Sequence, residues 1–245
     1  MRLFNRRRFL LGTAGIFTAS LAGYAGARDY QGGVPWEQGK ALPPDRYNPA
    51  KRFLTDAERR FVTAAVDRLI PADDFPSASQ LGVVDFIDHQ LAGSYGRGDI
   101  FYLQEPFLEG TDSQGYQSRA PSWLYRRAIR EIEGAIASNH DGKSFAELDE
   151  ATQDSILTDL ENGDLALPTA SASTFFSLLL QNTKEGYFGD PIHGGNRDME
   201  AWRMIGFPGA RYDYRPYVAR HNERLEFEPV SVAGFASRIT PNSTE

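Results

Sequence analysis

The most informative gap in the composition is the complete absence of cysteine from the 245 residues. A chain without thiols forms no disulfide, no thiolate metal site, no iron–sulfur cluster and no thioether-linked haem. The same absence suits a protein bound for an oxidising compartment, because stray thiols pair wrongly there. Several classes of redox and metal protein are therefore excluded for this chain.

The sequence also lacks the motifs of common enzyme classes. Two-wound flavin and nicotinamide enzymes need a glycine-rich turn between a strand and a helix, where the backbone approaches the pyrophosphate. The nearest match, GSYGRG at 93–98, has its glycines in the wrong order and no preceding strand, which predicts a loop. A phosphate-binding loop, a Gly-x-Ser-x-Gly elbow and a His-Glu-x-x-His motif are missing too. We therefore expect no catalytic residue, cofactor site or metal site in this chain.

The N-terminus has the features of a twin-arginine export signal. Its stretch NRRRFLLGTAG contains the paired arginines and apolar residues of such a signal, Arg6, Arg7, Phe9 and Leu10. A weakly apolar run follows and ends in the small residues 25–27, which suit a cleavage site. The run of about 19 residues is also just long enough for an uncleaved membrane anchor. We expect export to the periplasm of a protein that is already folded, usually because a cofactor must be inserted first.

Basic residues are scarce in the rest of the chain. Residues 1–27 hold four of the 26 Lys and Arg and none of the 33 Asp and Glu, so 22 basic residues remain against 33 acidic ones. The net charge after cleavage is about −11 by this count. A surface of this sign disfavours nucleic acids and anionic lipid headgroups as partners.

Two segments lack the periodicity of a packed element. Residues 28–52 combine glycines with four prolines, and residues 210–245 show too little apolar periodicity to hold a core. Both are expected to be irregular arms that wrap a partner. The predicted organisation is a signal peptide at 1–27, an N-terminal arm at 28–52, a helical domain at 53–209 and a C-terminal tail at 210–245.

Caps and apolar stripes predict that the domain is mainly α. Thr55 and Glu58 have the spacing of a capping box ahead of an apolar stripe that Pro71 ends. Further helices are expected over 79–91, 121–139, 144–163, from Ser171 or Ser173 to 186, and over 197–205. Residues 93–120 are expected to form a large ordered loop. A short run near 225–232 is the one possible strand.

Histidine offers two weak candidates for chemistry. Asp85 and His89, beside Asp88, would share a helix face as metal ligands sometimes do, and a solvated or capped polar face is the alternative. His193 lies in a turn and is either a base on an exposed loop or a structural residue.

Residues 186–210, GYFGDPIHGGNRDMEAWRMIGFPGA, resemble the signature of gluconate 2-dehydrogenase subunit 3 proteins. These proteins are the small subunits of membrane-associated, flavin-dependent sugar and polyol dehydrogenases. The resemblance extends to 61–88, FVTAAVDRLIPADDFPSASQLGVVDFID. His193 departs from the pattern, in which an aromatic residue, often tyrosine, is expected.

The resemblance implies a non-catalytic accessory role. FAD is then expected in a large partner subunit and haem c in a possible multihaem cytochrome subunit, with membrane association through the complex. This chain would escort the flavoprotein through export and stabilise it. The alternative is an independent periplasmic ligand- or metal-binding protein.

The same stretch supplies candidates for a partner interface. They are Tyr187, Phe188, Asp190, Pro191, Trp202 and Phe207. Large aromatic residues commonly anchor protein interfaces, so direct contact with a partner is one interpretation. The other is turn chemistry that packs this stretch against the helices of the same chain.

Overall fold

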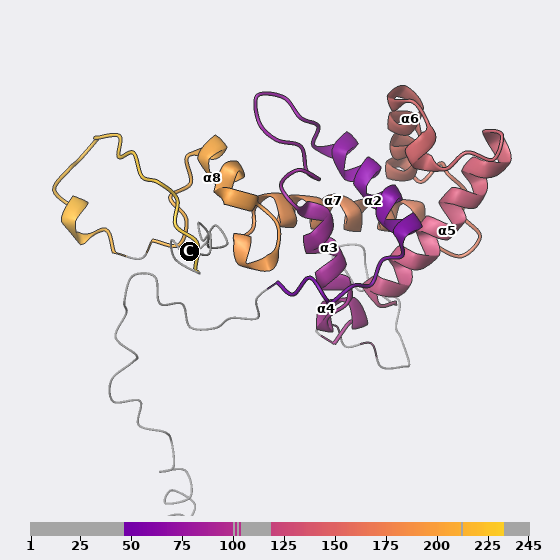
Figure 1. The fold of residues 1–245 in the computed structure, drawn as a ribbon, viewed down its shortest axis with the longest axis horizontal. Helices are drawn as coiled ribbons and strands as arrows, with labels where there is room; N and C mark the ends of the chain where they lie inside the picture. The colour runs from indigo at the N-terminus through magenta and orange to yellow at the C-terminus, as the bar shows by residue number, and fades with distance from the viewer. Residues whose placement is uncertain (1–46, 100, 102, 104–118, 212, 233–245) are drawn as a thin grey trace, which may run out of the picture. The chain divides into compact units, whose positions relative to one another are not determined.

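The computed structural model describes residues 47–99, 101, 103, 119–211 and 213–232, and this part is mainly helical (Figure 1). Its α-helices are α2 (Asp56–Leu69), α3 (Val83–Leu91), α4 (Ser94–Arg97), α5 (Pro121–Asn139), α6 (Glu150–Asn162), α7 (Ala172–Phe188) and α8 (Glu200–Ile205). Single 3-10 turns are η2 (Phe145–Glu147), η3 (Pro191–His193), η4 (Arg197–Met199) and η5 (Arg215–Tyr217). No β-strand occurs among these residues, and none of their helices is long and apolar enough to span a membrane. The prediction of a mainly α fold is confirmed.

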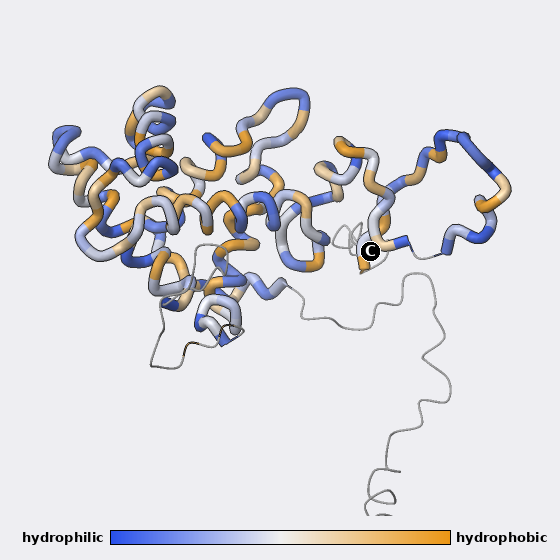
Figure 2. Tube along the Cα trace, turned by 180° about the vertical axis from the view of Figure 1, so that it is seen from behind, coloured by the Kyte–Doolittle hydropathy of each residue, from blue (hydrophilic) through white to orange (hydrophobic). Residues whose placement is uncertain are grey.

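The core forms around α2 and α7. Helix α2 packs against α3, α5, α6 and α7, and α7 also packs against α3, α5 and α6. Phe61 of α2 is fully buried, with its ring centroid 4.9 Å from that of Phe145 and 6.3 Å from that of Phe175. Apolar and polar residues alternate along the helices (Figure 2), as expected for helices that bury one face.

Two helices begin where local signals place them. At α2, the Glu58 amide donates to Thr55 Oγ1 at 3.3 Å and the Thr55 amide donates to Glu58 Oε2 at 2.8 Å, which completes the capping box. Helix α5 begins with Pro121 at its first turn, where the missing N–H has no helical partner to lose. Both helices follow the prediction.

Tertiary contacts shift two other helix starts. Helix α3 begins at Val83 and not at residue 79, because Ser79 is bound by Asp67: its amide and hydroxyl donate to the carboxylate at 2.8 and 2.6 Å. The predicted capping box at Ser144 is present, but it caps the single turn η2. Asp149 caps α6 instead.

Four further expectations need correction. Helix α7 continues past Gly186 to Phe188. Glycine at 186 does not end the helix but permits close packing, because a Cβ there would lie 2.8 Å from the Phe86 ring. The predicted loop 93–120 begins with the helical turn α4, and residues 104–118 lie outside the described part. The 197–205 helix is broken by positive φ angles at Asp198 and Met199. The possible strand near 225–232 amounts to one isolated bridge, between Gly209 and Val230.

Candidate functional site

The turn after α7 is built on close contact between backbones. We call residues 186–210 the glycine-rich block. A Cβ at Gly195 would lie 2.1 Å from the Gly186 carbonyl oxygen, so only glycine lets this turn lie against the end of α7. Asn196 is fully buried with φ 44°, and its side chain donates to the Gly189 carbonyl at 2.9 Å and accepts from the Ala201 amide at 3.1 Å. The block is therefore locked by its own polar contacts.

Asp190 ties the block to a segment far along the chain. Its Oδ1 accepts from the Ile192 amide at 3.0 Å, which caps η3, and from the Ser231 hydroxyl at 2.7 Å. Its Oδ2 accepts from the Val232 amide at 2.7 Å. The Ala210 amide also donates to the Val230 carbonyl, at 2.6 Å. We call this set of contacts the Asp190 clamp, and it closes the segment 210–230 into a loop.

The N-terminal end of the described chain joins the same place. The Tyr47 amide donates to the Ile192 carbonyl at 2.9 Å. The Tyr47 ring packs closely against Gly194, because a Cβ added to Gly194 would lie 2.6 Å from a ring carbon. The Tyr47 ring also contacts His89, with centroids 5.5 Å apart. Residue 47, the block and residues 230–232 thus meet around η3.

Two buried aromatic residues support two exposed ones. Tyr187 and Trp202 are 2% and 5% exposed, whereas Phe188 and Phe207 are 37% and 44% exposed. The rings meet edge to face, with centroids 5.0 Å apart for Tyr187–Phe188 and 5.1 Å for Trp202–Phe207. The Trp202 indole N–H donates to the Phe188 carbonyl at 2.6 Å, which joins the two pairs. We call the exposed pair Phe188 and Phe207 the apolar patch.

Tyr187 is anchored through its hydroxyl. The hydroxyl donates to the Pro76 carbonyl at 2.9 Å. Burial raises the pKa of this hydroxyl, and the negative charge of Asp73 raises it further, so the group stays a protonated donor. The base of the apolar patch is thereby fixed to the loop after α2.

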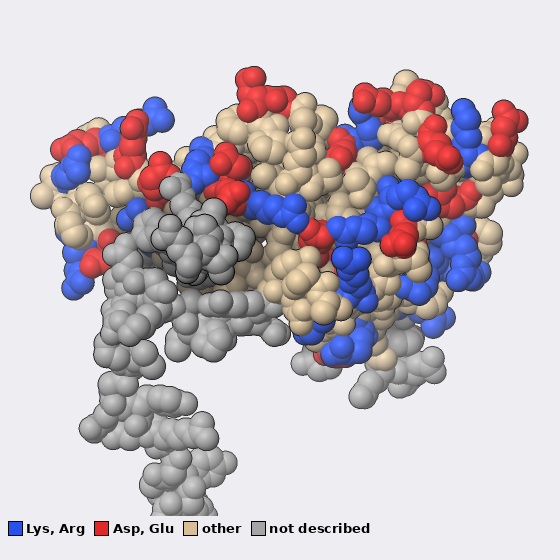
Figure 3. All heavy atoms as spheres, viewed as in Figure 1, with Lys and Arg blue, Asp and Glu red and all other residues tan. Residues whose placement is uncertain are grey.

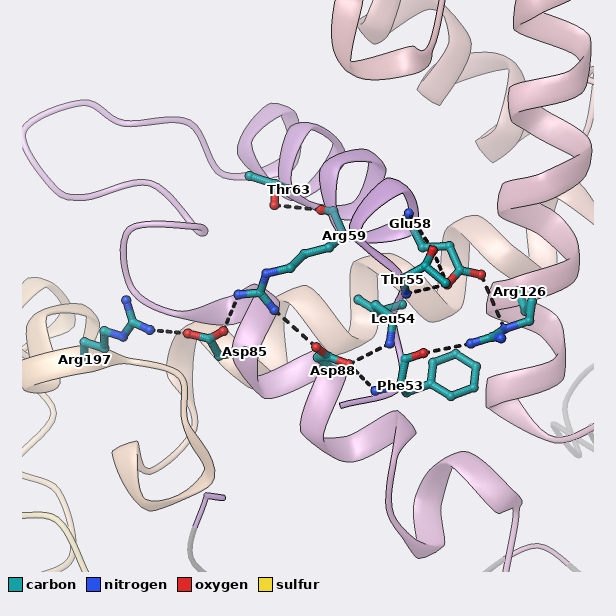
Figure 4. A network of polar contacts seen from close by, with 10 residues as sticks. All are labelled: Phe53, Leu54, Thr55, Glu58, Arg59, Thr63, Asp85, Asp88, Arg126 and Arg197. Atoms are coloured by element: carbon teal, nitrogen blue, oxygen red, sulfur yellow. Dashed lines mark hydrogen bonds and ion pairs between the residues drawn. The ribbon is translucent and has the colours of Figure 1, made fainter. Parts of the chain in front are cut away.

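A charged network fastens the block to the helices (Figure 4). Asp88 is 3% exposed and accepts from the Phe53 and Leu54 amides at 2.6 and 2.8 Å. Arg59 donates to Asp88 at 3.2 Å and also pairs with Asp85. Asp85 in turn pairs with Arg197 of the block, which is 112 residues away in the sequence.

This network bears on the metal interpretation of Asp85 and His89. The carboxylate of Asp85 faces two guanidinium groups, which repel a cation. Within the part of the chain that the structure describes, no group of three or more His, Asp or Glu side chains could hold a metal ion. Asp85 binds guanidinium groups of its own chain, and Asp88 binds backbone amides and Arg59.

The predicted interface residues divide into three kinds. Tyr187 and Trp202 lie in the interior, so they support a surface and do not form one. Asp190 and Pro191 are half-buried, and both oxygens of Asp190 bind the chain itself. Phe188 and Phe207 are exposed. The predicted export residues Arg6, Arg7, Phe9 and Leu10 lie outside the described part.

Sequence reasoning missed the partners of these residues. Ser231 and Val232 lie about 40 residues from Asp190, and no local spacing links them. The Arg197–Asp85 pair is equally invisible in the sequence. His193 is exposed at the end of η3, with its amide bound to the Asp190 carbonyl at 3.0 Å.

The described residues thus define an all-α domain whose glycine-rich block is closed by a segment of its own C-terminal tail. The chain belongs to the gluconate 2-dehydrogenase subunit 3 family, whose sequence model matches residues 56–209. The matched span includes α2 at one end and most of the block at the other. Searches of curated proteins and of solved structures gave no match. The family name describes one subunit of a multi-subunit dehydrogenase.

Proposed function

We propose that this chain is the non-catalytic small subunit of a periplasmic, membrane-associated, FAD-dependent sugar or polyol dehydrogenase complex. It escorts the large flavoprotein subunit through twin-arginine export and stabilises it there. FAD belongs to that large subunit, and a multihaem cytochrome subunit carrying haem c is a further candidate partner. Family membership and the Arg6–Arg7 leader support this proposal.

The observation that carries the proposal is the apolar patch. Phe188 and Phe207 expose about two fifths of their surface although each ring rests on a buried aromatic residue. Rigid, half-exposed aromatic residues are typical anchors of protein interfaces, because little side-chain entropy is lost when a partner covers them. The clamp and the Asp85–Arg197 pair hold the patch in one arrangement before any partner binds.

The area of the patch sets the expected size of the effect. An aromatic side chain buries roughly 150–250 Å² when fully covered. With about 40% of each ring left exposed, the two rings offer about 160 Å², which at about 25 cal/mol per Å² is at most about 4 kcal/mol. Costs of association reduce this figure, so we expect a loss of affinity of at least about tenfold when both are changed.

The first experiment is a pull-down of the tagged full chain from periplasmic and membrane fractions of the organism that encodes it. Mass spectrometry and a flavin absorbance spectrum of the eluate identify the partner. We expect a large flavoprotein with the unchanged chain and with Trp123→Ser, an exposed aromatic residue on α5 that serves as the matched control. The double variant Phe188→Ser/Phe207→Ser should no longer recover the flavoprotein. Equal recovery with both variants would show that the patch is not the docking surface.

The escort role has its own test. Arg6→Lys/Arg7→Lys should leave both this chain and the flavoprotein in the cytoplasm, because the twin-arginine route requires the pair. Normal export of the flavoprotein in a strain that lacks this chain would refute the escort role. Docking through the patch could still hold, since the pull-down tests it separately.

A further inference from the structure

One side of α5 carries arginine and tryptophan. Arg126, Arg127 and Arg130 follow Trp123 by three, four and seven residues, which places all four on one face of the helix. The other face is apolar and buried, with Leu124, Ala128, Ile129 and Ile132. Arg119 precedes the helix, and its guanidinium lies 5.3 Å from the Trp123 ring centroid. We call Arg119, Trp123, Arg126, Arg127 and Arg130 the arginine face.

This face surrounds an open depression of about 440 Å³. Its lining consists of Phe53, Ser122, Trp123, Arg126, Arg127 and Arg130. The Arg126 guanidinium lies 4.3 Å from the Phe53 ring centroid and donates to the Phe53 carbonyl at 2.7 Å. Trp123 is 40% exposed. The depression therefore combines aromatic walls with several guanidinium groups.

The local charge is positive although the whole chain is acidic. Two carboxylates approach the arginines: Glu58 lies 3.4 Å from Arg126, and Glu131 lies 2.6 Å from Arg127. Glu131 is turned inward, with a side chain that is 6% exposed and that accepts from the Thr169 and Ala170 amides. Among the residues that the structure describes, the four arginines of this face thus outnumber the two carboxylates that contact them.

Acidic residues gather elsewhere on the domain. The span 149–164, which contains α6, holds six Asp and Glu residues and no basic one: Asp149, Glu150, Asp154, Asp159, Glu161 and Asp164. Figure 3 shows acidic groups over α6 and basic groups lower on the same side, over α5. Charges separated by more than about 8–10 Å are largely screened at physiological salt, so a partner at α5 experiences the local charge. The expectation drawn from the net charge of the chain does not apply to this face.

We propose that the arginine face binds the anionic phospholipid headgroups of a membrane surface. Guanidinium groups match phosphate oxygens in pairs, and exposed tryptophan favours the level of the headgroups. Basic depressions of this kind hold lipid headgroups, while the acidic surface around α6 is repelled from the same membrane. The proposal goes beyond docking to a dehydrogenase and does not depend on it.

The test measures binding of the purified full chain to vesicles. Vesicles with about 30 mol% phosphatidylglycerol are compared with pure phosphatidylcholine by co-sedimentation at several salt concentrations. Arg119→Gln/Arg130→Gln should weaken binding to the anionic vesicles by about 25-fold, about fivefold for each charge. The control Arg220→Gln/Arg224→Gln removes two exposed arginines from the loop 211–230 and should have no effect. All variants share the same N-terminus, so its own affinity for lipid cancels.

Tryptophan fluorescence locates the contact. Brominated lipid in the anionic vesicles should quench the unchanged chain more than Trp123→Phe, because Trp123 would lie among the headgroups. The proposal is wrong if the two arginine pairs give equal binding, or if anionic and neutral vesicles bind equally well. It is also wrong if the Arg119/Arg130 variant loses a protein partner in the pull-down while its binding to vesicles is unchanged.

Discussion

The Asp190 clamp makes the most direct prediction about the fold. Asp190→Ala removes the hydrogen bonds from the Ser231 hydroxyl and the Val232 amide, each 2.7 Å long, and the cap on the Ile192 amide. The bridge between Gly209 and Val230 does not involve Asp190, but it loses the support of these bonds. We therefore expect the segment 230–232 to open locally while the helical core remains folded.

The size of this effect follows from the charge on the acceptor. Hydrogen bonds to a charged group contribute roughly 1.5–3 kcal/mol each, about twice the value for neutral pairs. The two bonds from Ser231 and Val232 thus stabilise the closed loop by about 3 kcal/mol. That value corresponds to a roughly hundredfold change in the opening equilibrium.

Amide hydrogen exchange measures the opening directly. The amides of Ala210 and Val232 donate to Val230 and Asp190, and we expect both to exchange faster in Asp190→Ala, with Val232 affected most. The matched control is Asp213→Ala, because Asp213 lies in the closed loop and binds its near neighbour Arg215. If exchange at Val232 is the same in both variants, the clamp does not hold the loop.

Two further predictions concern stability. Gly195→Ala should lower the melting temperature by at least about 6 °C or prevent folding, because the new Cβ would lie 2.1 Å from the Gly186 carbonyl oxygen. The control Gly134→Ala should raise the melting temperature by about 1–4 °C, because a Cβ at Gly134 has nothing within 4 Å. Equal melting temperatures would refute this account. Burial by itself would raise the pKa of Glu131. Hydrogen bonds from the Thr169–Ala170 turn outweigh this effect, so the pKa is lowered to about 2. Its stabilising contribution is complete above its ordinary pKa of 4.5 and is lost as pH falls toward about 2, so urea unfolding of Glu131→Gln should depend less on pH in that window.

Local signals in the sequence predicted much of the secondary structure. The Thr55–Glu58 capping box, the first-turn Pro121 and the left-handed cap at Gly163 all act where the sequence places them. Each of these signals works through atoms a few residues apart, so a single sequence contains the whole interaction.

The errors occur where distant contacts override such signals. Ser79 has the chemistry of a helix start but is bound by Asp67 of α2. Gly186 has the chemistry of a helix end but packs against Phe86 of α3, so α7 continues for two more residues. In both cases the competing partner lies on another helix.

The candidate site was predictable only in its residue types. The aromatic and glycine-rich stretch 186–210 was identified, but exposure divides its aromatic residues, since Trp202 is 5% exposed and Phe207 is 44% exposed. The arginine face does have a signal in the sequence, because Trp123, Arg126 and Arg130 are spaced on one side of a predicted helix.

Short-range spacing and motifs that are contiguous in the chain were enough to predict the mainly α fold, the family, and the starts of α2 and α5. No local pattern in the sequence predicts that Asp190 closes the loop onto residues 230–232, that Arg197 pairs with Asp85, or which aromatic rings stay exposed. These contacts join groups 41, 42 and 112 residues apart, and only the packing of the helices brings them together.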